Sequence, residues 1–396
     1  MQNIFRKVSK EEFFQTFWQK RPVLLEKAFP KFQNPLSSDE LFKLIQEEGV
    51  HSRLVFKEDP HQEDEEMECC FGPFDHDFID ERKESKAPWT LLINEMNTLS
   101  PDIHELLKSF SFLPSWRVDD IMVSHSSKGG SVGTHVDSYD VFLLQAQGQK
   151  RWRIGKENFE GEAIETEKGL KLVDKLTDFD EYILNPGDIL YLPPGRVHEG
   201  VAIDDDCMTL SIGMTAPKLE ELSMMYLSDL SQTAGSKDHV LRDPNLRPKE
   251  ERSAEIDPET IQNALKQLRE LVINEDVFIK SFGKVLTENK RESFDFEEED
   301  DYGEDLEDSA EDELYEEFRD GQKISITASF RGAYMKTKEE VLLFANGEDY
   351  VLAHSSLSFV QKLTTGKVVE LNRTLLEDER EFLEDLFERK LISLIK

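Results

Sequence analysis

The sequence predicts an α+β chain whose largest domain is mainly β, an antiparallel sandwich or barrel of short strands. Between residues 116 and 216, apolar runs of about five to eight residues alternate with Gly- and Pro-rich turns, the usual pattern of such folds. On both sides of this region the apolar residues recur with helical spacing instead. A chain of 396 residues is also long for a single core, so we expect two or three domains.

The elements that precede the strand-rich region are predicted from spacing and capping residues. Aromatic side chains at helical spacing indicate an amphipathic helix over residues 10–20, and a strand begins at Val23. Further helices are expected over residues 37–48, with Ser38 as the N-cap, and over residues 103–112.

After residue 216 the pattern becomes helical, then strongly acidic, and finally mixed. We expect helices over 219–230 and 258–280, an acidic solvated stretch over 293–320, and a tail of short strands with helices over 356–363 and 377–390.

These boundaries divide the chain into four parts. Residues 1–216 form the mainly β domain, 217–290 a helical region suited to dimerisation, 291–322 an acidic linker, and 323–396 a small winged-helix-like domain. The alternative for the helices is that they only cover one face of the β domain.

Charge and composition exclude several classes of function. With 48 basic and 83 acidic residues the net charge is −35, which repels nucleic acid and favours a basic protein as partner. Three cysteines are too few for a disulfide framework. The first residues lack the apolar core of a signal peptide, and no stretch approaches the roughly 20 apolar residues of a membrane span. We therefore expect a cytoplasmic protein without membrane contact.

One group of residues has the composition of a non-haem iron site. In the segment THVD, His135 and Asp137 stand two apart on a predicted strand, so both side chains point the same way. Two histidines and one carboxylate on one face of the metal are typical of iron(II) oxygenases. His198, after a Pro-Pro-Gly turn, is the candidate third ligand. A double-stranded β-helix brings such distant strands together.

An isolated His-x-Asp pair is more often a surface turn than a metal site, but the other histidines of the chain fit a metal site less well. His125 has no carboxylate two residues later, and His76 is followed directly by Asp77, which would point to the opposite strand face. The remaining five are expected on the surface: His51, His61, His104, His239 and His354.

The order of these motifs resembles the Jumonji-C-like cupin oxygenases. His135-x-Asp137 is followed by Lys150 and then by DILYLPPGRVHEG. More narrowly, WQKRPVLLEKAF, SRLV, FGPF and the segment from Trp116 to Arg153 are similar to the bacterial ribosomal oxygenases, which hydroxylate an arginine of large-subunit ribosomal protein sixteen. The motif match covers residues 13–216, and the rest agrees in layout only.

The resemblance implies Fe(II) at the three ligands, with 2-oxoglutarate and O2 as co-substrates. Lys150 would bind the distal carboxylate of 2-oxoglutarate, with Ser124 and Ser211 completing its cradle. The group often has arginine at position 150, and lysine keeps the charge without the bidentate fork. The alternative is that Lys150 is a surface strand residue and that the two serines are ordinary strand positions.

Acidic residues around the metal ligands are candidates for binding a cationic substrate side chain. Asp119 and Asp120 precede them, and Tyr139 and Asp140 follow. In a chain this acidic, each aspartate also has the simpler interpretation of solvated surface. The resemblance implies a basic ribosomal protein as substrate and no direct nucleic-acid contact, and the helical region suggests a homodimer.

Three other functions share these residues. The first is a cupin hydrolase, isomerase or dioxygenase that works without 2-oxoglutarate, although such sites often carry more histidine ligands. The second is a metal-binding scaffold without catalysis. The third is a demethylase, or a hydroxylase of another basic protein, and the sequence does not separate hydroxylation from demethylation.

Overall fold

The computed structural model describes residues 4–57, 67–85, 87–161, 164–165, 170–173, 176–233, 241, 258–288 and 318–395. The chain divides into two compact units, Met1–Ala216 and Pro217–Lys396. Most of the acidic stretch over residues 293–320 lies outside the described residues, as do His61 and His239. Within the described part, no helix is both long and apolar enough to span a membrane.

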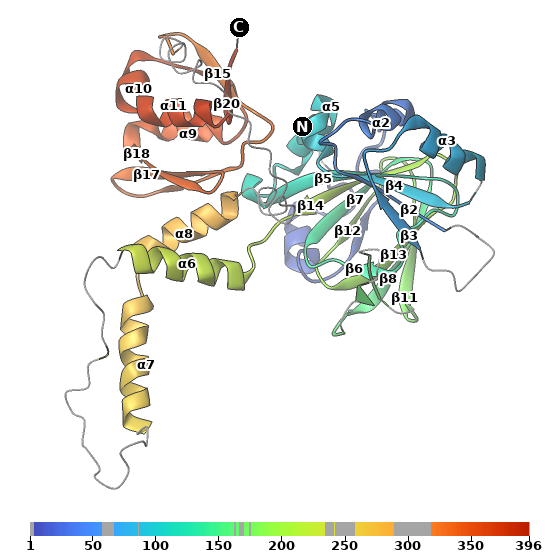
Figure 1. Cartoon of the computed structure of the whole chain (residues 1–396), viewed down its shortest axis with the longest axis horizontal. Helices are drawn as coiled ribbons and strands as arrows, with labels where there is room; N and C mark the ends of the chain where they lie inside the picture. The colour runs from blue at the N-terminus through green and yellow to red at the C-terminus, as the bar shows by residue number, and fades with distance from the viewer. Residues whose placement is uncertain are drawn as a thin grey trace. The chain divides into compact units, whose positions relative to one another are not determined.

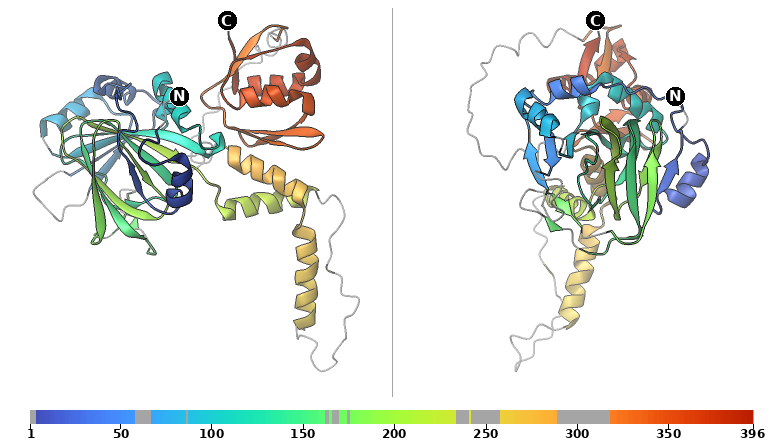
Figure 2. Two further views of the ribbon diagram at one scale, coloured as in Figure 1. Left: turned by 180° about the vertical axis from the view of Figure 1, so that it is seen from behind. Right: turned by 90° about the vertical axis from the view of Figure 1, so that its right-hand side faces the viewer.

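The first unit is built from two antiparallel sheets that face each other (Figure 1 and Figure 2). The major sheet has the order β1 (Val23–Leu25), β12 (Ile189–Leu192), β7 (Asp140–Gln147), β14 (Cys207–Met214), β5 (Val118–Ser126), β4 (Trp89–Ile93), β2 (Ser52–Phe56) and β3 (Glu68–Phe71). The minor sheet has the order β11 (Phe179–Leu184), β8 (Lys150–Asn158), β13 (Arg196–Ala202) and β6 (His135–Val136). β9 (Ile164–Glu165) and β10 (Lys171–Leu172) pair antiparallel with each other.

Successive strands pass back and forth between the two sheets. β7 belongs to the major sheet, β8 and β11 to the minor, β12 to the major, β13 to the minor and β14 to the major. This alternation is the predicted double-stranded β-helix, and it confirms the fold. Its consequence is that side chains from distant segments meet between the sheets.

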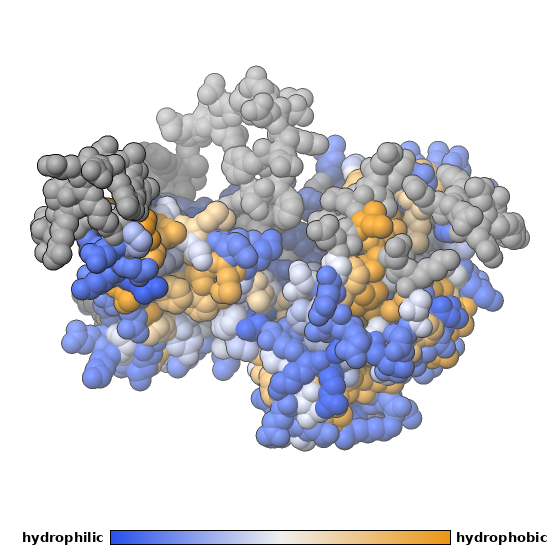
Figure 3. Space-filling model, turned by 90° about the horizontal axis from the view of Figure 1, so that it is seen from below, coloured by the Kyte–Doolittle hydropathy of each residue, from blue (hydrophilic) through white to orange (hydrophobic). Residues whose placement is uncertain are grey.

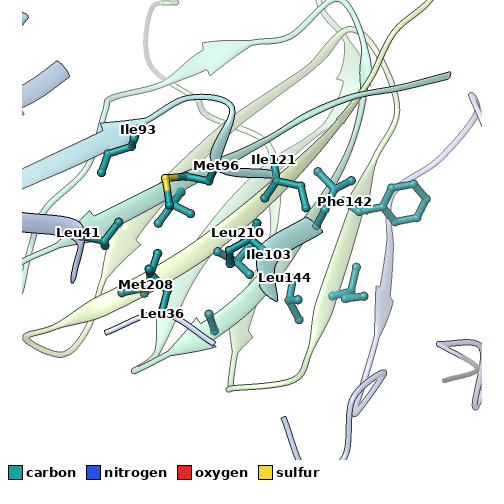
Figure 4. Close-up of a cluster of buried hydrophobic side chains, with 14 of the residues drawn as sticks. Leu36, Leu41, Ile93, Met96, Ile103, Ile121, Phe142, Leu144, Met208 and Leu210 are labelled. Atoms are coloured by element: carbon teal, nitrogen blue, oxygen red, sulfur yellow. The ribbon is translucent and has the colours of Figure 1, made fainter. Parts of the chain in front are cut away.

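The largest core lies on the other face of the major sheet, under the N-terminal helices. Phe142 and Leu144 of β7 and Leu210 of β14 pack there with Leu41, as Figure 4 shows. The helices of this unit are α1 (Lys10–Glu12), the π-helix η1 (Phe13–Phe17), α2 (Ser38–Leu44), α3 (His76–Ser85), α4 (Met96–Leu99), α5 (Pro101–Leu106), and the 3-10 turns η2 (Leu107–Phe110) and η3 (Ser115–Arg117).

The predicted cap of the second helix was wrong by one residue. Ser37 is the N-cap of α2 and forms a capping box with Glu40. The hydroxyl of Ser38 instead donates to Asp206, which also accepts a hydrogen bond from His125 at 2.6 Å. This network joins α2 to the loop before β14.

The second unit begins with α6 (Leu219–Thr233), α7 (Pro258–Val272) and α8 (Glu275–Thr287). The prediction of a single helix over residues 258–280 was wrong, because the backbone is extended at Asn274, between α7 and α8. The Asn274 side chain caps α8 by accepting a hydrogen bond from the Val277 amide. The hydroxyl of Tyr226 in α6 accepts from the Asn274 amide at 3.0 Å, which holds the break in place.

Two small sheets and three helices form the remainder of the second unit. Its elements are β15 (Lys323–Ile326), β16 (Gly332–Lys336), β17 (Glu340–Ala345), β18 (Glu348–Ala353), the turn η6 (His354–Ser356), α9 (Leu357–Leu363), β19 (Val369–Glu370), α10 (Arg373–Asp378), α11 (Arg380–Glu388) and β20 (Ile392–Ile395).

The expected continuous helix over 377–390 is interrupted at Glu379. This buried carboxylate accepts from the Ser356 hydroxyl at 2.6 Å and the Ala353 amide at 3.1 Å, and its backbone leaves the helical conformation. Tertiary hydrogen bonds thus override the helical pattern. The winged-helix-like assignment of this part stays a prediction.

Candidate metal centre

The three predicted ligands come together between β6 and β13. His135 lies directly opposite His198 in the antiparallel register, and Asp137 follows β6. The centres of the two imidazole rings are 4.1 Å apart, and His198 Nε2 is 3.5 Å from Asp137 Oδ2. One ligand atom from each of the three residues lies within 4.8 Å of the others. Such a group is compact enough to hold one metal ion on one face.

The hydrogen bonds of the histidines favour metal binding through Nε2. His135 Nδ1 is 3.1 Å from the Gly133 carbonyl oxygen, and His198 Nδ1 is 2.8 Å from the Arg196 carbonyl oxygen. A carbonyl only accepts, so each Nδ1 carries the proton and each Nε2 keeps its lone pair for a metal. Burial, with His135 alongside, lowers the pKa of His198 to about 4, so its imidazole is neutral at pH 7.

Glycines and prolines shape the two turns that carry the ligands. Gly133 precedes the first histidine with φ +85°, and Gly195 closes the Pro-Pro-Gly turn with φ +80°, both in the left-handed region. The Gly195 amide donates to the Asp137 carbonyl at 2.8 Å. The His-x-Asp segment and the Pro-Pro-Gly turn are therefore joined directly, which fixes the third ligand against the first two.

Lys150 stands on β8 of the same sheet and is buried. Its side chain is 4% exposed, its Nζ is 3.4 Å from the Ser124 hydroxyl and 5.2 Å from the centre of the Trp152 ring. Burial lowers the pKa of the Lys150 ammonium. Among the described residues no carboxylate forms an ion pair with it. A buried cation that lacks a counter-charge is costly, which suits a site for an anionic ligand.

The two predicted serines lie on the same face of the major sheet. Ser124 on β5 faces Thr209 on β14, and Ser211 stands two residues beyond Thr209, so both hydroxyls point toward the minor sheet. Of the two, Ser124 has the hydrogen bond to Lys150, and Ser211 lies beside Met122 and Leu143.

Trp152 belongs to the apolar cluster between the sheets, and it also lines this site. Its ring lies 5.9 Å from His198, and a Cβ at Gly200 would come within 2.7 Å of it, so position 200 needs glycine. The buried indole nitrogen has no hydrogen-bond partner among the described residues. The spacing Lys150-x-Trp152 on one strand was the available signal, since both side chains then share a face.

The acidic candidates divide into two groups. Tyr139 is 44% exposed beside the metal ligands, and burial of its hydroxyl, with Asp137 and Asp120 and more weakly Asp119 nearby, raises its pKa. Asp120 also accepts from the Glu95 amide at 3.1 Å. Asp120, and more weakly Asp119, therefore lie within electrostatic range of Tyr139, which follows the metal ligands.

Asp140 lies apart from that group. It is 2% exposed on the core face of β7, accepts from Gln19 at 2.9 Å and from the Tyr191 hydroxyl, and burial raises its pKa. The structure does not bring this residue to the metal ligands.

Comparison with known proteins places these observations in a family. Residues 105–222 match the JmjC domain. The chain is 35% identical over 291 residues to "Ribosomal protein uL16 3-hydroxylase" of Escherichia coli strain K12, covering 71% of this chain and 72% of that protein. It is 34% identical over 270 residues to "Probable ribosomal oxygenase" of Haemophilus influenzae, covering 66% of this chain and 63% of the relative.

A solved structure agrees over the whole length. The structure of YcfD, a ribosomal oxygenase from Escherichia coli in complex with cobalt and 2-oxoglutarate, superposes with a TM-score of 0.76 at 29% identity, covering 99% of both chains. The sequence identity, the fold and the geometry of the metal centre lead to one conclusion. This chain belongs to the JmjC-domain ribosomal oxygenases.

Proposed function

We propose that this protein is an Fe(II)- and 2-oxoglutarate-dependent oxygenase that hydroxylates an arginine of ribosomal protein uL16. His135, Asp137 and His198 hold the iron. The observation that carries the proposal is the convergence of ligand atoms from two histidines and one aspartate within 4.8 Å, which is the donor set of non-haem iron oxygenases. A relative carries the name uL16 3-hydroxylase, and the similar structure of YcfD was solved with cobalt and 2-oxoglutarate.

The residues around Lys150 fit the co-substrate. A dicarboxylate that chelates the metal at one end carries its second carboxylate away from it, and Lys150 supplies the buried cation for that end. Ser124 Oγ, 3.4 Å from Lys150 Nζ, completes the cradle together with Ser211, and the partnerless Trp152 N–H is a further donor. When bound, iron, 2-oxoglutarate and O2 supply the oxidative chemistry that inserts one oxygen into a C–H bond.

The chain's own residues then select and orient the substrate. Asp119, Asp120 and Tyr139 offer carboxylate and hydroxyl acceptors for a guanidinium at the opening. The net charge of −35 attracts a basic ribosomal protein to this surface. Because ribosomal proteins are made and assembled in the cytoplasm, that compartment is the proposed site of action.

The second unit provides a dimer interface within residues 217–290. Three apolar side chains at helical spacing in α7 are exposed, Ile261 by 46%, Leu265 by 39% and Leu268 by 54%. Hydrophobic residues gather over this part of the chain in Figure 3. A second copy of the chain would cover the stripe. Light scattering of a Leu265→Glu, Leu268→Glu variant should report a monomer where the wild type gives a dimer.

The test of the reaction is direct. The protein is incubated with Fe(II), ascorbate, 2-oxoglutarate and uL16, and tandem mass spectrometry locates the added oxygen. One oxygen on an arginine carbon is the expected result. Oxygen on histidine would refute the arginine assignment alone. Release of formaldehyde from a methylated peptide would indicate a demethylase, and a failure to consume 2-oxoglutarate would indicate a scaffold.

A further inference from the structure

A row of cross-strand neighbours leads from the edge of the major sheet to the Lys150 site. Phe71 on β3 faces Arg53 on β2, Arg53 faces Leu92 on β4, and Leu92 faces Ser124 on β5. Directly opposed residues in antiparallel strands point to the same side of a sheet. Because Ser124 bonds Lys150, this whole row faces the minor sheet. The labels β3, β2, β4 and β5 follow its course in Figure 1.

Arg53 is an unusual residue at this position. It is half-buried, its Nε is buried without a hydrogen-bond partner, and its guanidinium forms no ion pair with any carboxylate that the structure describes. The five N–H donors of its guanidinium are suited to binding oxygen atoms that another molecule supplies.

The face that carries Arg53 is packed against the segment that leads to the metal ligands. Val55, two residues after Arg53 on β2, lies in one apolar cluster with Cys69 of β3 and with Val132, three residues before His135. Burial raises the pKa of Cys69, and the nearby Arg53 guanidinium opposes that shift. The guanidinium therefore stands on the side of β2 that faces the metal site, next to the edge strand β3.

Phe71 forms the outer end of the row and is 68% exposed. Toward the interior, Leu92 and Val55 are buried, with Met122 and Cys69 packed against them. An exposed aromatic side chain next to the residues that line a catalytic site is a typical contact for a bound protein. Phe71 and Arg53 thus present an apolar surface and a set of donors side by side.

We infer that Arg53 and Phe71 form a subsite for the main chain of the protein substrate beside the oxidised residue. Arg53 donates to a backbone carbonyl of an extended segment, and Phe71 packs against an apolar side chain of that segment. A carbonyl fits better than a substrate carboxylate, because the net charge of −35 repels a negative charge. The inference rests on the proposed function for the identity of the substrate.

The test compares two variants with two controls. Phe71→Ser and Arg53→Lys alter the subsite. Ile183→Ser and Arg151→Lys make the same exchanges on β11 and β8, where Ile183 and Arg151 are cross-strand partners on the face opposite to Lys150. Fluorescence anisotropy with labelled uL16 peptides and Mn(II) in place of Fe(II) gives the peptide Kd without turnover. The Kd for 2-oxoglutarate is measured in parallel by calorimetry.

The expected result is a peptide Kd raised about tenfold or more in Phe71→Ser and Arg53→Lys, near wild type in both controls, with the 2-oxoglutarate Kd unchanged in all four. Replacing the apolar neighbours of the target residue in the peptide by serine should remove the effect of Phe71→Ser and leave that of Arg53→Lys. A peptide Kd within twofold of wild type in both subsite variants would overturn the inference.

The subsite and the proposed function can be tested separately. Subsite-dependent peptide binding without any oxidation would support the subsite and contradict the hydroxylase. Oxidation of the peptide with no dependence on Phe71 or Arg53 would support the hydroxylase and contradict the subsite. Phe71 is exposed, so Phe71→Ser tests the subsite even if replacement of the half-buried Arg53 impairs folding.

Discussion

The metal ligands and the Lys150 pocket both lie at the minor sheet, with His198 and Lys150 buried, but their polar atoms are satisfied differently. Each imidazole Nδ1 at the metal ligands donates to a carbonyl within 3.1 Å, so those rings are fixed before any metal binds. Lys150 has one hydroxyl at 3.4 Å, and the neighbouring Trp152 N–H has no partner among the described residues. The protein has therefore preorganised the metal site and left the anion pocket to be completed by its ligand.

The strongest test of this contrast removes a fixed ligand. His198→Ala should abolish metal binding and all turnover of 2-oxoglutarate, because the two remaining protein ligands are too few to displace water from Fe(II). Alanine also lacks the imidazole ring, whose hydrogen bond to the Arg196 carbonyl orients this ligand. Metal content measured after dialysis, together with turnover, checks the result. His104→Ala, at an exposed histidine, is the control. Retained activity in His198→Ala would refute the ligand assignment.

The second test concerns the anion pocket. Lys150→Ala should raise the KM for 2-oxoglutarate about tenfold or more, equivalent to roughly 1.4 kcal/mol, while metal binding stays intact. Lys150→Arg should keep the charge and most of the affinity. Arg151→Ala, which points to the other side of β8, controls for loss of a cation from the strand. An unchanged KM in Lys150→Ala would mean that another cation binds the distal carboxylate.

The clustering of the three candidate ligands could be predicted from the sequence. His135 and Asp137 stand two apart and share a face, and the predicted double-stranded β-helix brings the distant His198 to them. Asp140 is the informative exception. Asp140, Phe142 and Leu144 stand two apart on β7 and therefore share a face, and Phe142 and Leu144 face the N-terminal core. This spacing could have shown that Asp140 does not point toward the metal ligands.

Other features depend on contacts that no local pattern reveals. The Phe71-Arg53-Leu92-Ser124 row exists only through the pairing of four strands. The helix breaks at Asn274 and Glu379 follow from hydrogen bonds to Tyr226 and Ser356, which lie 48 and 23 residues away. The sequence also does not show whether the indole N–H of Trp152 finds a hydrogen-bond partner.

The third test asks whether the Trp152 ring supports both parts of the site. Gly200→Ala would place a methyl group about 2.7 Å from that ring, so either the indole or β13 must shift. We expect a loss of about 1–3 kcal/mol in the free energy of unfolding, typical of overpacking, measured by urea denaturation. The metal affinity should fall as well, because His198 is two residues away on β13. If Gly200→Ala combined with Trp152→Leu is no more stable than Gly200→Ala alone, the ring is not the cause.

The smallest expected effect is a pH dependence that belongs to the Lys150 pocket. Burial lowers the pKa of Lys150, so the ammonium begins to lose its proton at a lower pH than a solvated lysine would. A bound carboxylate stabilises the ammonium and raises that pKa again, so binding takes up a proton once the pH exceeds the pKa of the free pocket. The affinity for 2-oxoglutarate should therefore decrease, by a few-fold, as the pH rises from 7 toward 9.5.

Arginine stays charged throughout this range, so Lys150→Arg should bind with an affinity that hardly changes. Calorimetry in buffers of different ionisation enthalpy measures both the Kd and the proton uptake. Parallel pH profiles for the wild type and Lys150→Arg would show that a different group titrates, and the assignment of the cation in this pocket would fail.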